Sequence, residues 1–256
     1  MEEIRNALLD FKKSGKFIYA YAENYTQGAY YLVSVSDKIF LNPQGSLTLN
    51  GLTSQLMFYK GTLDKLEIEP QIIRHGKFKS AVEPFIRENM SDENREQIAG
   101  FINPIWKHII TNIAASRKMT AEEINLMADS LKINEAKDAL DNKMVDKLCY
   151  YDEFIADLNS KLKNKSDEKP EFITLSKYKN TAISTSTASD KIAVIYANGE
   201  ISSGEGDDEK IGSETLANTI AEARKDDKIK AIVLRVNSPG RSEEHTSELQ
   251  SRVDIS

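Results

Sequence analysis

Strand-like and helix-like segments alternate in the first ninety residues of this 256-residue chain, and this alternation limits its possible folds more than any other feature. The predicted elements, in order, are a helix over 2–13, a strand over 17–21, a helix over 28–34, a strand over 38–41 and an extended segment near 47–49. Alternation of this kind favours a parallel sheet covered by helices. We therefore predict an α/β fold.

The same alternation returns after residue 190. The predicted elements are a strand over 192–196, a helix over 213–224 and a strand over 229–236. The last strand is rich in Ile, Val and Leu without polar alternation, which predicts a strand buried on both faces. A turn, NSPG, follows it and ends at Gly240. A second α/β segment is therefore expected over 191–240.

A helical region and a polar linker separate these two parts. Apolar residues at helical spacing continue across 91–162, where Pro104 should kink the first helix or lie near its start. The sequence TAEE at 120–123 predicts a capping box for the next helix, and 138–148 closes the region as a further apolar-patterned segment. Residues 163–190 are too polar to form a core and predict a linker.

Composition excludes several classes of function. The formal net charge of -6 argues against a nucleic-acid partner, because phosphate recognition needs a basic face. The single cysteine, Cys149, can form no internal disulfide, and we expect it to be a small packing residue. His108 has no second ligand at suitable spacing, so we expect no metal site, and no pattern indicates a cofactor.

The two ends of the chain differ from the rest of the sequence. Residues 241–256 read RSEEHTSELQSRVDIS, and the first eleven resemble the translation of a sequencing adapter, so we exclude this tail from fold reasoning. At the other end, a helix that directly follows Met1 suggests that a preceding strand belongs to the natural protein. We expect a truncated fragment that carries neither a signal nor a membrane anchor.

Five strings spread over residues 1–240 carry a resemblance to a known family. They are YAY at 19–21, QGAYYL at 27–32, PQG at 43–45, KSAVEPF at 79–85 and IVLRVNSPG at 232–240. Their order and spacing resemble the signal peptide peptidase A (protease IV) family in its long, tandem-repeat form. The resemblance implies a crotonase-like (Clp protease-like) fold of repeated ββα units, incompletely duplicated here and interrupted by a helical insertion.

The resemblance also assigns the segments. Residues 1–90 become the second part of the amino-terminal repeat, which carries the base lysine, and 91–162 become the helical segment. Residues 163–190 remain the polar linker, and 191–240 become the start of the carboxy-terminal repeat. Residues 241–256 remain a non-native tail.

Lys79 is the candidate general base, because it matches the lysine with which this family deprotonates a serine. A lysine can act as a base near neutral pH only where its surroundings lower its pKa from about 10.4. We expect apolar neighbours such as Ile72, Phe78 and Phe85 to provide that setting. The local pattern alone favours a solvated lysine, and Lys77 would point the same way in a strand, so only the resemblance selects Lys79.

The nucleophile and the oxyanion hole are incomplete in this chain. Gly240 matches the first glycine of the family's oxyanion hole, but Arg241 stands where a second glycine is expected. The family's nucleophilic serine lies beyond Gly240, and Gln27 occupies the equivalent place in the first repeat. We therefore assign no nucleophilic serine in this chain.

The resemblance implies a serine endopeptidase that degrades signal peptides and other short hydrophobic peptides. It further implies a ring-shaped homo-oligomer at the bacterial inner membrane, with its catalytic part outside the cytoplasm. This fragment, lacking the nucleophile, should be inactive. A noncatalytic scaffold or assembly module is the alternative, and an acyl-thioester enzyme of crotonase type is a weaker one, because no pattern indicates its nucleotide-binding surface or carboxylates.

Overall fold

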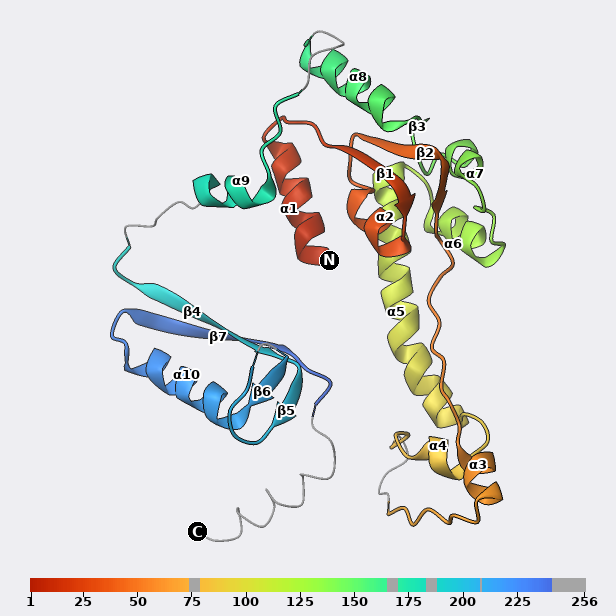
Figure 1. The fold of residues 1–256 in the computed structure, drawn as a ribbon, viewed down its shortest axis with the longest axis vertical. Helices are drawn as coiled ribbons and strands as arrows, with labels where there is room; N and C mark the ends of the chain where they lie inside the picture. The colour runs from red at the N-terminus through yellow and green to blue at the C-terminus, as the bar shows by residue number, and fades with distance from the viewer. Residues whose placement is uncertain (74–78, 165–169, 183–187, 208, 241–256) are drawn as a thin grey trace. The chain divides into compact units, whose positions relative to one another are not determined.

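The computed structural model describes residues 1–73, 79–164, 170–182, 188–207 and 209–240. The chain is mixed α/β and divides into two compact units, Met1–Phe172 and Ile173–Ser256, each described here by itself (Figure 1). The division falls within residues 163–190, the predicted linker.

The first unit is built on a three-stranded parallel sheet in the order β1-β2-β3. Its elements are α1 (Glu2–Lys13), β1 (Tyr19–Tyr25), α2 (Gln27–Val33), β2 (Lys38–Leu47), α3 (Lys60–Lys65), α4 (Glu83–Ile86), α5 (Asp92–Arg117), α6 (Ala121–Asp129), α7 (Ala136–Asp141), β3 (Lys147–Leu148) and α8 (Tyr151–Leu162). The parallel pairing agrees with the alternating sequence pattern. The strand predicted at 38–41 is longer than expected: β2 continues to Leu47, the first residue of the extended segment predicted at 47–49.

An irregularity in the β1–β2 register lets β2 pass through Pro43. Ala22 pairs with Leu41 and Asn24 with Ser46, so the register shifts by several residues between these two pairs. Pro43 lies in the stretch of β2 that this shift leaves out of the ladder, where the absence of an N–H group costs no β1–β2 hydrogen bond. In the same stretch, a Cβ atom on Gly45 would lie 1.8 Å from the carbonyl oxygen of Glu23, so the two backbones can approach only at a glycine.

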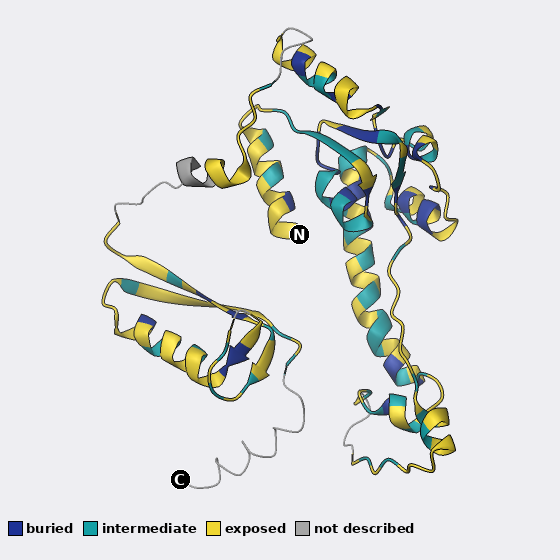
Figure 2. Cartoon of the chain, in the orientation of Figure 1, coloured by how far each residue is buried: buried dark blue, intermediate teal, exposed yellow. Residues whose placement is uncertain are grey.

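The core of the first unit lies where the sheet meets α2, α5, α6 and α7 (Figure 2). Tyr30, Ile39, Ile113 and Ile124 are fully buried there. Each such side chain contributes about 1.5–3 kcal/mol relative to an exposed one. The hydroxyl of Tyr30 donates a hydrogen bond to the Met144 carbonyl oxygen at 2.6 Å, and burial raises the pKa of Tyr30 above its usual value.

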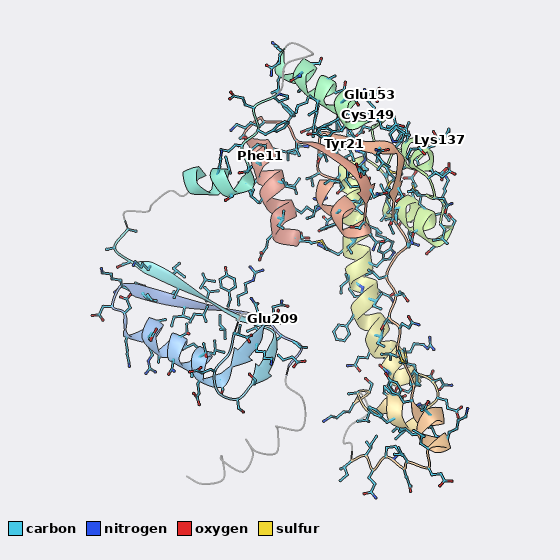
Figure 3. All side chains as sticks on the ribbon, viewed as in Figure 1. Phe11, Tyr21, Lys137, Cys149, Glu153 and Glu209 are labelled. Carbon is cyan, nitrogen blue, oxygen red and sulfur yellow. The ribbon has the colours of Figure 1, made fainter. Side chains whose placement is uncertain are left out.

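A second, smaller cluster confirms the packing role of Cys149. Its side chain is fully buried against Phe40 and Phe154, and Tyr21 packs against the same cluster. Figure 3 shows Cys149 and Tyr21 side by side at this end of the sheet. Burial raises the pKa of the Cys149 thiol, which favours its protonated form.

Residues 138–148 form less helix than their apolar pattern suggests. Helix α7 ends at Asp141, and the chain then turns through Lys143, at φ 60°, into strand β3. Asp146 fixes this turn, because its carboxylate accepts a hydrogen bond from the Ile39 backbone N–H at 2.7 Å. The same carboxylate accepts two hydrogen bonds from Arg117, at 2.9 and 3.1 Å. Pairing with β2 therefore overrides local helical pattern in this segment.

Helix α5 is the longest element and extends well beyond the sheet (Figure 1). The Ser91 hydroxyl caps its first turn by accepting a hydrogen bond from the Asn94 N–H at 3.1 Å, and Lys118 ends it in the left-handed conformation. Pro104 lies inside the helix, which continues past it. The amino-terminal half is sparsely covered: Phe101 and Ile105 are 64% and 53% exposed.

The second unit contains a parallel pair of strands with a helix against it. Its elements are α9 (Leu175–Ala182), β4 (Lys191–Asn198), β5 (Glu200–Ser202), β6 (Lys210–Gly212), α10 (Ser213–Lys225) and β7 (Ile229–Asn237). β4 pairs with β7, and the short strands β5 and β6 pair with each other. Helix α9 lies within the predicted linker.

The prediction that the last strand is buried was wrong for this unit. Val233, Leu234 and Val236 of β7 are 49%, 47% and 61% exposed (Figure 2). In the described part of the unit, β7 has one neighbouring strand, β4, and no layer covers the sheet face opposite α10. The apolar composition of β7 therefore predicts a buried strand, but the described part of this unit leaves the strand exposed.

Candidate functional site

Lys79 lies in the first unit, just before the turn that leads into α4, and its side chain is exposed. The predicted apolar setting is not formed by the described residues, because Ile73 is fully exposed and Phe85 is 43% exposed. Phe78 and the alternative base Lys77 lie outside the described residues. The described residues of the unit therefore do not supply the desolvation that a basic lysine needs.

A buried carboxylate anchors the segment that follows Lys79. Glu83 is 3% exposed, and its backbone N–H donates a hydrogen bond to the Ser80 carbonyl oxygen at 3.0 Å. Its carboxylate accepts hydrogen bonds from the Ser91 hydroxyl, from the Ser91 N–H at 3.2 Å and from the Asn94 side-chain amide at 3.0 Å. Burial acts to raise the pKa of Glu83, but the hydrogen bonds from Ser91 and Asn94 outweigh it and hold the pKa below its usual value.

In the sequence, Glu83 stands out only as part of the string KSAVEPF at 79–85. The available signal was the spacing between Glu83 and the Ser91 cap of α5, eight residues later, which places an acidic side chain near a helix amino terminus. That signal is weak, because nothing in the sequence shows that the intervening residues fold back.

An exposed apolar surface lies beside this anchor. The Tyr59 and Phe85 rings stack with centroids 6.0 Å apart, and the Tyr59 N–H donates to the Pro84 carbonyl oxygen at 2.7 Å. A hollow of about 550 Å³ adjoins Phe85 and is also lined by Ile68 and by charged side chains of α3 and of the segment after it, namely Lys60, Asp64, Glu67 and Glu69. Ile68 is 50% exposed. The segment after Lys79 thus presents apolar groups that the first unit leaves uncovered.

Gln27 serves a structural purpose at the amino terminus of α2. Its amide nitrogen donates to the Gly51 carbonyl oxygen at 3.0 Å, and its amide oxygen accepts from the Asn50 and Gly51 N–H groups at 3.2 and 3.1 Å. The side chain therefore fixes the chain where it leaves β2.

Gly240 ends a turn that is tied to the neighbouring loop of the second unit. Its φ of 103° favours glycine. Its N–H donates to the Ser238 hydroxyl at 3.1 Å, and its carbonyl oxygen accepts from the Ile201 N–H at 3.1 Å. The N–H that would contribute to an oxyanion hole is therefore directed at Ser238 in this chain. Arg241 lies outside the described residues.

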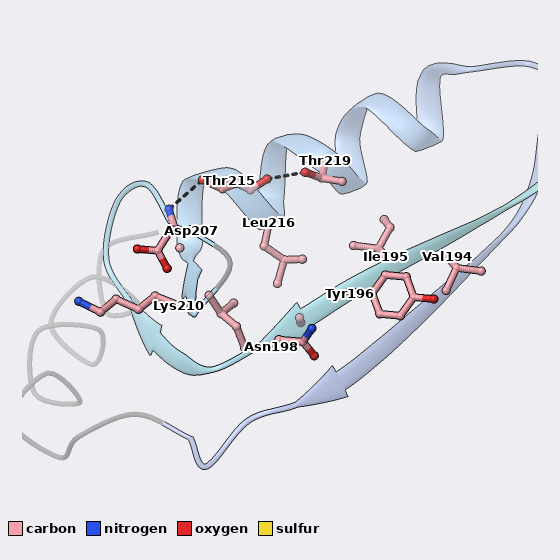
Figure 4. A pocket seen from close by; sticks show the side chains of 13 residues that line it. Val194, Ile195, Tyr196, Asn198, Asp207, Lys210, Thr215, Leu216 and Thr219 are labelled. Carbon is pink, nitrogen blue, oxygen red and sulfur yellow. Dashed lines mark hydrogen bonds between the residues drawn. The ribbon is translucent and has the colours of Figure 1, made fainter. Parts of the chain in front are cut away.

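A pocket of about 280 Å³ lies at the carboxyl end of β4, between that strand, β6 and α10 (Figure 4). Thr215 of α10 braces it: its hydroxyl oxygen accepts from the Gly206 N–H at 3.0 Å, and its carbonyl oxygen accepts from the Thr219 hydroxyl at 2.8 Å. Asn198 at the end of β4 pairs with Asn237, just before the Gly240 turn. Ligands of parallel α/β sheets bind at this edge.

Within the described ranges, no cluster of three or more His, Cys, Asp or Glu side chains is arranged to hold a metal ion. His108 instead contacts Glu2 through its Nε2 at 2.9 Å. No described helix combines the length and the hydropathy that crossing a membrane requires.

Comparison with known proteins identifies the family. The profile described as Peptidase family S49 matches residues 10–166, more than half of the chain. The chain belongs to peptidase family S49. It is 39% identical over 252 residues to "Protease 4" of Salmonella typhi, covering 94% of this chain and 40% of that protein. "Protease 4" of Haemophilus influenzae is 34% identical, with 94% and 41% covered.

A plant relative extends the comparison. "Serine protease SPPA, chloroplastic" of Arabidopsis thaliana is 32% identical over 249 residues, covering 94% of this chain and 36% of that protein. The predicted resemblance is thereby confirmed, and this S49 chain spans about two fifths of the length of these three relatives. The S49 match includes Lys79 and ends before Gly240, and the roles of both residues remain predictions.

Proposed function

We propose that the whole protein containing this S49 chain is a serine endopeptidase that uses a serine/lysine dyad. The observation that carries the proposal is the 34–39% identity to bacterial proteases across 94% of the chain. In this proposal Lys79 is the general base, and the nucleophilic serine lies in sequence beyond Gly240. The chain alone is then an inactive fragment.

The proposed chemistry sets clear requirements. The neutral Lys79 amine accepts the proton of the serine hydroxyl as the serine oxygen attacks the peptide carbonyl carbon, and the resulting ammonium donates that proton to the leaving amine. Backbone N–H groups, with Gly240 as one candidate, stabilise the negative charge on the carbonyl oxygen. Because Lys79 is exposed in the first unit, it must become covered in the whole protein, and the exposed apolar side chains of Ile73 and Phe85, on either side of it in the sequence, support such a covering.

Substrate, assembly and location follow from the family resemblance. We propose crotonase-like repeats, signal peptides and other short hydrophobic peptides as substrates, and a ring-shaped homo-oligomer at the bacterial inner membrane with its catalytic part outside the cytoplasm. The exposed apolar surface beside Phe85 supports a hydrophobic substrate or neighbour.

A noncatalytic scaffold is the second candidate. It is favoured by the exposed apolar side chains Phe101 and Ile105 on the long helix α5, which suit a protein contact. This candidate requires no nucleophile.

The test uses the longer protein with its natural sequence on both sides. We expect a fluorophosphonate probe to label it, and we expect Lys79→Ala to lower kcat about 10²–10⁴-fold, the usual contribution of a general base. Lys65→Ala, which changes a lysine of α3, is the matched control and should retain activity. Full activity of Lys79→Ala would refute the assigned base, and an unlabelled, inactive longer protein would favour the scaffold.

A further inference from the structure

Glu83 is a buried carboxylate that makes no ion pair within the described residues. Three donors at the start of α5 take the place of a cation: the Ser91 N–H, the Ser91 hydroxyl and the Asn94 side-chain amide. The amino terminus of a helix adds a favourable partial positive charge. The ionised carboxylate is therefore stabilised mainly by the hydrogen bonds of the helix cap, and the charge of Arg87 adds a smaller contribution.

This anchor holds both sides of the turn that follows Lys79. The Glu83 N–H closes the turn on Ser80, and the next residue, Pro84, accepts a backbone hydrogen bond from Tyr59. The turn is thus bonded to α5 on one side and to the segment before α3 on the other. Lys79 precedes this bonded turn by one residue.

We infer that Glu83 is a positioning residue, which fixes the backbone carrying Lys79 to the capped end of α5 so that the lysine amine meets the nucleophilic serine. The inference rests on the proposed function. It assigns Glu83 no contact with substrate or with the reacting atoms. The geometry that carries it is the set of hydrogen bonds from Ser91 and Asn94 to one buried carboxylate.

Glu83→Gln weakens this anchor with little change in volume. Glutamine offers one acceptor oxygen, and its amide nitrogen would face donors from Ser91 or Asn94, so some of these hydrogen bonds must be lost. A displacement of about 1 Å at a reacting group can cost about 100-fold in rate. The carboxylate is therefore needed for its two acceptor oxygens.

The experiment measures kcat and KM of the longer protein on a fluorogenic hydrophobic peptide, with kcat expressed per serine that a fluorophosphonate titrates. We expect Glu83→Gln to lower kcat per reactive serine about 10- to 100-fold and to leave KM within about twofold. The acid limb of the kcat/KM pH profile, which reports the base, should also move. A merely structural role would reduce the number of reactive serines without changing either quantity per serine.

Two further variants test the same hydrogen bonds from the helix side. Ser91→Ala removes the hydroxyl and should also lower kcat per reactive serine, whereas Ser91→Thr keeps the hydroxyl and should restore it. The matched control is Glu88→Gln, which alters an exposed carboxylate of the same loop and should leave kcat unchanged. If Glu83→Gln does not fold, Asn94→Ala removes a single donor, and a normal kcat in that variant overturns the inference.

The outcomes separate this inference from the proposed function. If Lys79→Ala is inactive and Glu83→Gln has normal kcat, KM and pH profile, the positioning role is wrong and the base assignment stands. If Lys79→Ala is fully active, the base assignment fails, and the positioning role fails with it.

Discussion

Replacing Asp146 with alanine should destabilise the first unit far more than breaking any surface ion pair. The Asp146 carboxylate accepts hydrogen bonds from both terminal nitrogens of Arg117 and from the Ile39 N–H, and so joins the end of α5 to β2 and to the turn before β3. The Arg117 side chain is only 9% exposed, whereas that of Asp146 is 34% exposed.

The magnitude follows from what alanine leaves behind. Removing one partner of a fully buried ion pair costs about 3–5 kcal/mol, and an unsatisfied buried N–H costs about 1–3 kcal/mol. Water reaches Asp146 in part, and Arg117 keeps its hydrogen bonds to the Lys143 carbonyl oxygen, so we reduce the expected loss to about 2–4 kcal/mol. Asp146→Asn, which preserves the shape and one acceptor oxygen, should lose about half as much.

The assay is urea unfolding of the full chain followed by tryptophan fluorescence. Trp106, the only tryptophan, lies in α5, so the signal reports the first unit. The control is Asp157→Ala, which breaks the more exposed pair with Lys147 and should cost less than about 1 kcal/mol. Equal losses for Asp146→Ala and Asp157→Ala would show that the buried arginine does not depend on its carboxylate.

Three further predictions use the same chain. Gly45→Ala should cost more than about 2 kcal/mol in urea unfolding because its Cβ meets the Glu23 carbonyl oxygen, whereas Gly61→Ala, with open space and a helical position, should be neutral or stabilising. The Glu83 pKa lies below its usual value of 4.5, so the ionised carboxylate stabilises the fold above that pH. This stability is lost as the pH falls through the lowered pKa, and Glu83→Gln should show a smaller decrease in urea midpoint between pH 6 and pH 3. Cys149 should react with a thiol reagent at pH 8 only after denaturant is added, and rapid labelling of the native chain would contradict its burial.

Local signals in the sequence predicted many elements well. The helix over 2–13 has the bounds of α1, and the predicted capping box at Thr120 is present, with the Glu123 side chain accepting from the Thr120 N–H. These signals succeed because they depend on neighbours within one turn of helix. The segment 138–148 contradicted its apparent pattern because its last residues pair with β2, a contact that no local window contains.

The candidate site could be predicted from the sequence only through short motifs that resemble those of a known family. The resemblance located Lys79, but the described residues of the first unit do not form the expected apolar setting, because Ile73 and Phe85 are exposed. Strand β7 shows a similar difference. Its composition indicates burial, but the described part of its own unit leaves the strand exposed. The buried position of Glu83 could not be predicted from the sequence, because its hydrogen-bond donors become neighbours only when the chain folds back onto the start of α5.

Helix α5 connects the core to the capped end that binds Glu83. Its 26 residues span about 39 Å, of which about 20 Å lies between Pro104 and the capped end that binds Glu83. A tilt of about 5° at Pro104 would therefore carry that end through about 1.7 Å, more than the displacement that costs a reaction about 100-fold. Under the proposed dyad, a protein that binds the exposed face at Phe101 and Ile105 and tilts the helix would change the rate of peptide cleavage without contacting the reacting atoms.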